Sequence, residues 1–181
     1  MKLKRYLPVL LVIALLALAA VGVFKYVDIN RQYPAAEKLE FQLNEAFLFD
    51  DFSLMQTETE ILEYDEFIER YPDLQNVNFG ADNDNLQFVL AKFHIENTSA
   101  ETKSIVLYAA TFSTLTYSNG IDTIMFEAVN GDNANLAPQL TGGESTDIVF
   151  TYSVVKTQAG DISNGRIYFN LYPQEISFLI N

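Results

Sequence analysis

An uncharged apolar run near the N-terminus, residues 7–24, constrains the architecture of this chain more than any other feature. The run reads LPVLLVIALLALAAVGVF, and twelve of its 18 residues are Leu, Ile, Val or Phe. A run of this length that is apolar on every face is typical of a membrane-spanning helix and not of a helix packed on a soluble core. We therefore expect residues 7–27 to form a transmembrane helix that serves as a signal anchor.

The charges around the run predict its orientation. Three basic residues precede it and two follow it closely: Lys2, Lys4 and Arg5, then Lys25 and Arg31. The excess of basic residues on the N-terminal side places residues 1–6 in the cytoplasm and the rest of the chain outside the cell. A cleaved signal peptide is the competing interpretation, because Ala17-Leu18-Ala19 has a small-x-small pattern. We favour the retained anchor, since apolar residues continue beyond that pattern without a polar region.

Composition excludes several classes of function. The part of the chain after Lys25 holds 7 basic and all 24 acidic residues, a net charge of −17. A surface this acidic repels nucleic-acid phosphates, so we expect no nucleic-acid partner. The absence of cysteine from all 181 residues excludes disulfides, thiolate catalysis, cysteine-ligated metals and a lipid-modified cysteine anchor. No sequence feature indicates a cofactor.

The remainder of the chain is organised as a spacer and one domain. Residues 28–38 are polar with paired alanines, and we interpret them as a spacer that leads into a single domain at residues 39–181. Alternating apolar residues predict strands there. The clearest alternations are Ile148, Phe150, Tyr152, Val154; Ile167, Phe169, Leu171; and Ile176, Phe178, Ile180.

Further strands are expected within residues 39–43, 52–62, 104–117 and 121–128. In residues 86–96 the apolar phase shifts, which indicates a β-bulge or a central strand covered on both faces. One segment has helical spacing instead: Tyr64, Phe67, Ile68 and Tyr71. Pro72 ends that helix. The strand count predicts a mainly β fold, an immunoglobulin-like β-sandwich with one short helix.

The order of these features resembles a known family. The spacer NRQYPAAE, the helix EYDEFIERYPDL and the strand–turn–strand LQFVLAKFHIENTSAETKSIVLY are similar to small membrane-anchored envelope proteins of Gram-positive bacteria, the family called domain of unknown function 5028. The block of residues 87–154 is also similar to telokin-like surface domains of immunoglobulin fold. The resemblance implies a surface-anchored domain and brings no established activity with it.

A cation site is the first candidate for chemistry. Asp82, Asp84 and Asn85 offer closely spaced oxygens of the kind that Ca²⁺ prefers. The spacing does not follow the EF-hand loop, because Leu86 stands where an oxygen ligand belongs. We favour a solvated turn over a metal site.

The remaining polar and aromatic candidates have structural explanations. His94, the only histidine, falls on the polar side of a strand and has no recognisable catalytic partner. The alternation Thr57-Glu58-Thr59-Glu60 indicates the solvated side of an edge strand. The carboxylates Asp50, Asp51, Glu58, Glu60 and Glu63 lack the features of a glycosidase pair. The aromatics near the first strands are expected in the core: Phe41, Phe47, Phe49 and Phe52.

Together these observations favour a non-enzymatic binding or accessory module that contacts another protein of the cell envelope. Two alternatives stay open. One is an enzyme acting on the cell wall, which requires a cleft with carboxylates of raised pKa. The other is a Ca²⁺-dependent adhesion module at the Asp82 turn.

Overall fold

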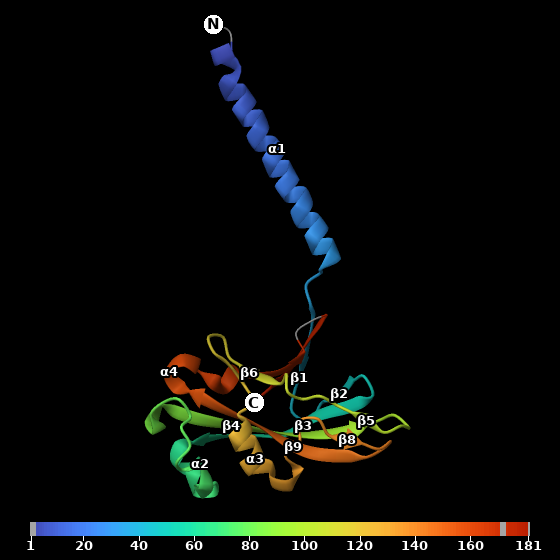
Figure 1. Cartoon of the computed structure of the whole chain (residues 1–181), viewed down its shortest axis with the longest axis vertical. Helices are drawn as coiled ribbons and strands as arrows, with labels where there is room; N and C mark the ends of the chain where they lie inside the picture. Colours follow the sequence, from blue (N-terminus) through green and yellow to red (C-terminus); the bar gives the residue numbers. More distant parts are fainter. Residues whose placement is uncertain (1–2, 171–172, 181) are drawn as a thin grey trace. The chain divides into compact units, whose positions relative to one another are not determined.

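The computed structural model describes the backbone of residues 3–170 and 173–180, and their side chains except those of residues 3–11, 13 and 14. The chain divides into two compact units, residues 1–36 and 37–181 (Figure 1). The first unit consists mainly of helix α1 (Leu3–Gln32). Within the described part of the chain, no helix combines the length and the apolar composition needed to cross a membrane.

The predicted segment of residues 7–27 lies within α1, but several of its side chains fall outside the described ones. The helix continues through residues 28–32 of the expected spacer. The second unit begins at Glu37, with its first strand, and not at residue 39.

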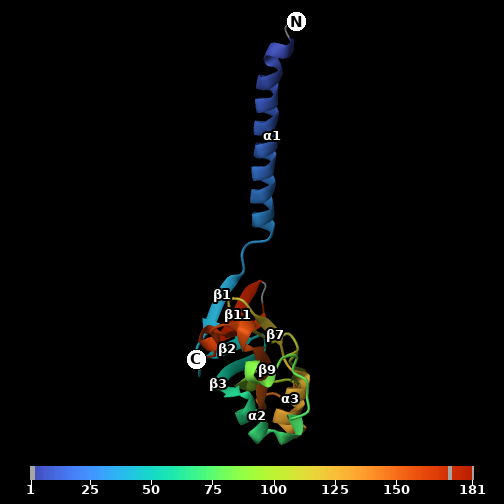
Figure 2. The same ribbon diagram turned by 90° about the vertical axis from the view of Figure 1, so that its left-hand side faces the viewer.

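Two sheets form the framework of residues 37–180. Neighbouring strands of the five-stranded sheet are, in order, β1 (Glu37–Phe41), β11 (Gln174–Leu179), β10 (Arg166–Asn170), β6 (Thr111–Ser113) and β7 (Ser118–Gly120). Those of the four-stranded sheet are β2 (Ala46–Phe49), β3 (Phe52–Glu63), β4 (Leu86–Asn97) and β9 (Ser145–Val155). A short pair consists of β5 (Lys103–Ser104) and β8 (Gln139–Leu140). All of the described pairings are antiparallel except that of β1 with β11, which lie side by side in Figure 2.

The main core lies between the two sheets, as the alternation predicts. Phe93 of β4 meets Phe178 of β11 edge to face, with ring centroids 5.0 Å apart, and both side chains are fully buried. Ile167, Phe169 and Ile180 contribute to the same core, with Phe169 only partly buried. Burying such side chains stabilises the fold by roughly 1.5–3 kcal/mol each. The expected strand alternations are therefore confirmed, apart from Leu171, which lies outside the described residues.

Strand β4 is covered on both faces, which confirms one of the two explanations for its shift of phase. Val89, Ala91 and Phe93 face the main core. Phe88 and Leu90 belong to a second apolar cluster that includes Phe67 of α2 and Met125 of α3. A strand buried on both faces has apolar residues at nearly every position, so period-two alternation disappears.

The bulge lies in the neighbouring strand, between Gln56 and Glu58 of β3. Before the bulge, even-numbered Phe52 and Leu54 point into the main core; after it, even-numbered Leu62 points into the second cluster. One inserted residue reverses the phase of a strand because side chains alternate between faces. The bulge thus lets β3 contribute side chains to both the main core and the second apolar cluster.

The expectation of a single short helix is wrong. Helix α2 (Tyr64–Arg70) is the expected one, and it ends before Pro72. Helices α3 (Thr123–Asn130) and α4 (Lys156–Ala159) are also present, with short 3-10 turns at Pro72–Leu74, Asn83–Asn85, Gly131–Asn133 and Ile162–Asn164. α3 replaces the strand expected at residues 121–128, because the Asp122 carboxylate accepts a hydrogen bond from the Met125 amide and caps the helix. The strand expected at residues 104–117 is likewise broken: Ser104 belongs to β5, and residues 111–113 form β6.

Candidate functional site

An open groove lies on the outer face of the five-stranded sheet. Phe112 of β6 and Ile167 of β10 point into the core, so the alternate side chains of these strands point outward. The hollow has a volume of about 710 Å³. Its described lining residues are Lys38, Ala109, Thr111, Ser113, Thr114, Ser118, Tyr168, Phe169, Asn170 and Glu175.

The groove is rich in hydroxyl groups and carries no net charge. Its described lining has one cation and one anion, Lys38 and Glu175, which form an ion pair at 3.4 Å. Thr111, Ser113 and Ser118 supply neutral donors and acceptors. This surface suits a ligand that binds by hydrogen bonds and by contact with Tyr168.

The neutrality of the groove contrasts with the rest of residues 37–180, which hold 6 basic and 23 acidic residues. Each of the six basic side chains pairs with a carboxylate of the same unit. The pairs are Lys38–Glu175, Arg70–Glu60, Lys92–Asp147, Lys103–Asp51, Lys156–Glu63 and Arg166–Glu40. The unit therefore presents no unpaired lysine or arginine to an anionic ligand, and 17 carboxylates have no cationic partner among these six.

His94 has a partner that sequence reasoning missed. It lies directly opposite Asp147 in the pairing of β4 with β9, and its Nδ1 is 2.8 Å from the carboxylate. Lys92 Nζ approaches the other carboxylate oxygen at 2.9 Å. The hydrogen bond with His94, followed by that with Lys92, lowers the pKa of Asp147 below its ordinary value. All three side chains are partly exposed, so the trio behaves as a surface charge network.

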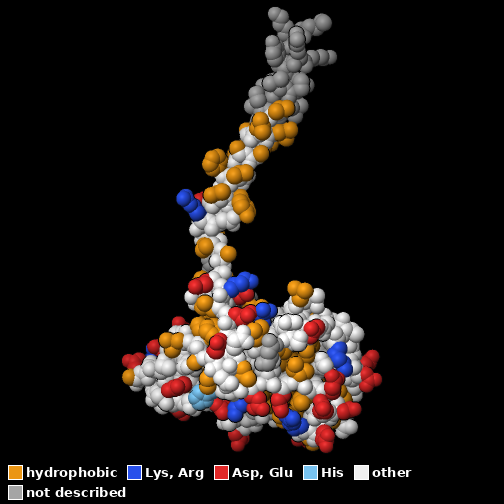
Figure 3. Space-filling model, turned by 180° about the vertical axis from the view of Figure 1, so that it is seen from behind, with side chains coloured by type: hydrophobic (Ala, Val, Ile, Leu, Met, Phe, Trp, Pro, Cys, Tyr) orange, Lys and Arg blue, Asp and Glu red, His pale blue; other side chains and the backbone are white. Residues whose placement is uncertain are grey.

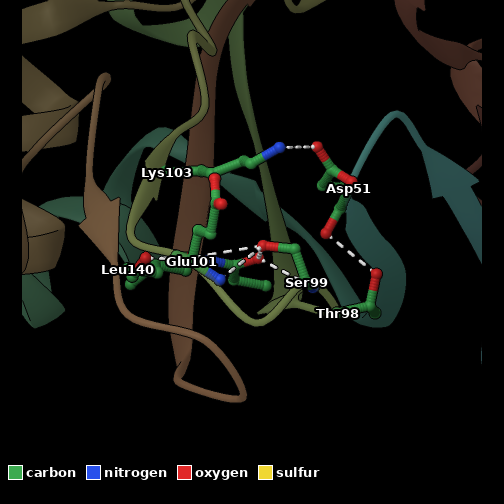
Figure 4. A network of polar contacts seen from close by, with 7 residues as sticks. Asp51, Thr98, Ser99, Glu101, Lys103 and Leu140 are labelled. Carbon is green, nitrogen blue, oxygen red and sulfur yellow. Dashed lines mark hydrogen bonds and ion pairs between the residues drawn. The ribbon is translucent and has the colours of Figure 1, made fainter.

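A second polar network joins the turn of Asp51 to the end of β4 (Figure 4). Asn97 is fully buried at its centre. Its Nδ2 donates to the carbonyl oxygens of Glu101 and Leu140, at 2.7 and 2.8 Å, and its Oδ1 accepts from the amide and hydroxyl of Ser99. These four bonds use the whole capacity of an amide side chain, so we assign this network a structural role.

Asp51 contributes to the same network, as its carbonyl oxygen accepts hydrogen bonds from the Thr98 amide and hydroxyl and its carboxylate pairs with Lys103. Asp50 has a φ of +51° in the two-residue turn between β2 and β3. Both carboxylates therefore belong to a hairpin turn. The aromatic prediction is confirmed: Phe52 is buried, and Phe41, Phe47 and Phe49 are partly buried against the main core.

The Ca²⁺ candidates lie on the turn before β4. Asp82 and Asp84 are exposed, and Asn85 uses its amide oxygen to accept from the Thr157 backbone and its amide nitrogen to donate to the Thr157 hydroxyl. Among the residues that the structure describes, no group of three or more His, Cys, Asp or Glu side chains is placed to hold a metal ion.

The carboxylates of β3 are spread along its outer part. Glu60 pairs with Arg70, and Glu63 accepts hydrogen bonds from Lys156 and Gln87, which lower its pKa. Strand β2 pairs only with Phe52–Met55, so residues 57–60 lie on an edge, as predicted. The groove, in contrast, had no signal in the sequence, because its lining residues are common polar types on strands far apart in the chain.

The fold and the groove define a small, mainly β protein of two packed sheets with a few short helices. Residues 30–175 match the family described as domain of unknown function (DUF5028), and the chain belongs to that family. No curated protein matches the chain.

Several solved structures are similar to the chain. A conserved hypothetical protein from Bacillus anthracis is 14% identical, with a TM-score of 0.48, over 75% of this chain and 94% of that one. The yjhA protein from Bacillus subtilis is 12% identical, with a TM-score of 0.47, over 74% and 84% of the two chains. An uncharacterized beta-sandwich protein from Clostridium difficile 630 is 9% identical, with a TM-score of 0.47, over 81% and 96%.

Proposed function

We propose that this protein is a membrane-anchored binding module of the Gram-positive cell envelope, which contacts another envelope protein through the groove on its five-stranded sheet. Residues 1–6 lie in the cytoplasm, residues 7–27 cross the membrane, and the β unit lies outside. The apolar run and the bias of basic residues toward its N-terminal side support this placement.

The topology supports an immunoglobulin-like sandwich as the scaffold. In chain order and sheet order, β3, β4 and β9 correspond to strands A, B and E of that fold, and β6, β10 and β11 to strands C, F and G. Strand β1 then adds to the last strand in parallel. Sandwiches of this kind use their exposed faces and loops for binding, which agrees with the position of the groove.

The neutral, hydroxyl-lined groove is the observation that carries the proposal. On a unit of net charge −17, it is a large surface where a partner meets no unpaired carboxylate among the described lining residues. Polar, uncharged and partly aromatic surfaces are suited to reversible protein contacts, since they lose their hydration without leaving a charged group unpaired.

The pKa values favour binding over the wall-enzyme alternative. A general acid needs a carboxyl group whose pKa is raised toward neutrality. The shifted carboxylates among the described residues, Glu63, Glu144, Asp147 and Asp161, all have lowered pKa values because hydrogen-bond donors stabilise their charged forms.

A single introduced cysteine tests the proposal, because the natural chain has none. Ser118→Cys places a thiol at the exposed side of the groove, and Asp132→Cys places one on an exposed turn outside it. In intact cells, a membrane-impermeant maleimide should label both. A photo-crosslinker attached to the thiol should then give one discrete protein adduct from position 118 and none from position 132.

Labelling that appears only after lysis would overturn the outward orientation. Identical adducts from the two positions, or no adduct from either, would overturn the groove as the contact surface. A melting temperature equal to that of the natural chain shows that each variant is folded.

A further inference from the structure

We propose that the outer edge of β3, residues 57–63, accepts an extended basic segment of another protein as an added strand. The four-stranded sheet has two edges. Contacts within the chain cover the edge at β9, whereas part of the edge at β3 is open. This edge is separate from the groove, and strand addition there goes beyond the proposed function.

The edge at β9 is closed by the chain itself. The Asn130 side chain accepts from the Val149 amide and donates to the Val149 carbonyl, as a neighbouring strand would do. The Asp122 amide donates to the carbonyl of Thr151, and Tyr117 and Asn119 donate to that of Ser153. These contacts use the backbone groups that would otherwise be free to form hydrogen bonds with another strand.

The edge at β3 is half open. Strand β2 covers Phe52–Met55 and ends there, while β3 continues for eight more residues, of which seven are paired on one side with β4. No described strand lies on the other side of residues 57–63. An incoming strand would therefore occupy the place that β2 leaves vacant, and seven residues offer about 23 Å of edge.

Charge indicates which strand fits this edge. Glu58 is exposed and has no ion pair among the described residues, whereas Glu60 and Glu63, which follow it along the strand, are paired with Arg70 and Lys156. Beside the edge is a hollow of about 280 Å³ lined by Leu62, Glu66, Glu69 and Arg70. Carboxylate side chains are dense at the end of the domain that carries α2 (Figure 3).

Carboxylates along an edge repel a second copy of the same acidic unit, whose net charge is also −17. They attract lysine and arginine side chains on an incoming strand, since opposite charges on adjacent strands stabilise the pair. The edge is thereby closed to self-association and open to a basic segment.

The test uses a nine-residue peptide of alternating lysine and valine added to the full chain, with binding followed by hydrogen exchange. Amides within residues 57–63 should exchange at least tenfold more slowly. A glutamate–valine peptide should give no protection. The lysine–valine peptide methylated on every backbone nitrogen should bind at least tenfold more weakly, because it cannot donate backbone hydrogen bonds.

Charge reversal on the protein provides the matched control. Glu58→Lys with Glu69→Lys should weaken peptide binding at least fivefold, whereas Glu127→Lys with Asp132→Lys, the same change of charge near the β9 edge, should leave it within twofold. Equal binding of the methylated peptide, protection outside residues 57–63, or self-association through β3 would each overturn the inference. Modification of Ser118→Cys should not alter peptide binding, so a failed groove and a failed edge can be distinguished.

Discussion

At the scale of single residues, the fully buried side-chain amide of Asn97 holds several segments of the β unit together. Its four hydrogen bonds join the end of β4 to the loop at Ser99–Glu101 and to β8. Each partner is a backbone or hydroxyl group that loses its bond if the amide is removed. The loop geometry therefore depends on one side chain.

We expect Asn97→Ala to lower the free energy of unfolding by about 2–4 kcal/mol, because it leaves buried polar groups without partners. Urea denaturation of the full chain measures the change. The matched control is Asn83→Ala, at an exposed amide, which should change stability by less than about 0.5 kcal/mol. Equal effects of the two substitutions would contradict the role assigned to Asn97.

The charge trio of His94, Lys92 and Asp147 shows what a sequence alone leaves hidden at this scale. The placement of His94 on the polar side of a strand could be predicted from its apolar neighbours Phe93 and Ile95. Its partner could not be, because Asp147 becomes adjacent only through the register of β4 with β9. Cross-strand contacts between distant segments depend on register, and a period-two pattern fixes which face a residue takes but not which residue of the partner strand it meets.

At the scale of elements, α3 is a helix where the sequence pattern predicts a strand. Residues 121–128 contain Ile, Thr and Phe, which favour a strand by composition. The helix forms because Asp122 caps its start, Gly131 adopts a φ of +54° just after its end, and Met125 and Phe126 reach different apolar clusters. A cap and a terminal glycine outweighed β propensity over eight residues.

The same element tests the cap. Asp122→Ala should cost about 1–2 kcal/mol of stability, since the Met125 amide loses its acceptor and the Ser153 hydroxyl loses a contact at 3.3 Å. Thermal and urea unfolding measure this cost, with Asp132→Ala on an exposed turn as the control. Unfolding curves that coincide for the natural chain and Asp122→Ala would show that the cap is not needed.

Helix α2 and the strands of the main core were predictable because their periodicity is strong and local. Tyr64, Phe67 and Ile68 recur with helical spacing before a proline, and Ile148 to Val154 alternate without interruption. The bulge in β3 was not predicted at its position, since one extra residue leaves no mark on composition. The groove escaped prediction for a related reason: its hydroxyl groups become neighbours only when β6, β7 and β10 lie side by side.

At the scale of the whole molecule, uncompensated negative charge is the dominant electrostatic feature. The 6 basic side chains of residues 37–180 are all paired, and the 17 remaining carboxylates repel one another. Salt weakens both the pairs and the repulsion. Exposed pairs contribute little, so relief of the repulsion should prevail.

We expect sodium chloride to stabilise the protein, with the free energy of unfolding rising on the order of 1 kcal/mol between low salt and 0.5 M. Thermal unfolding at neutral pH gives the measurement. The dependence should shrink near pH 4, where many carboxylates become protonated. A free energy of unfolding that falls with salt would mean that the six ion pairs outweigh the repulsion.

The parallel pairing of β1 with β11 determines how late in synthesis the five-stranded sheet can be completed. Residues 37–41 align with residues 174–178, so the first strand of the β unit gains its neighbour only after more than 130 further residues have been made. Until then β1 has no partner in its sheet, and β10 lacks β11 as well. The domain therefore cannot complete its five-stranded sheet until β11 has been made, and a variant that lacks residues 174–178 would leave β1 without its neighbour.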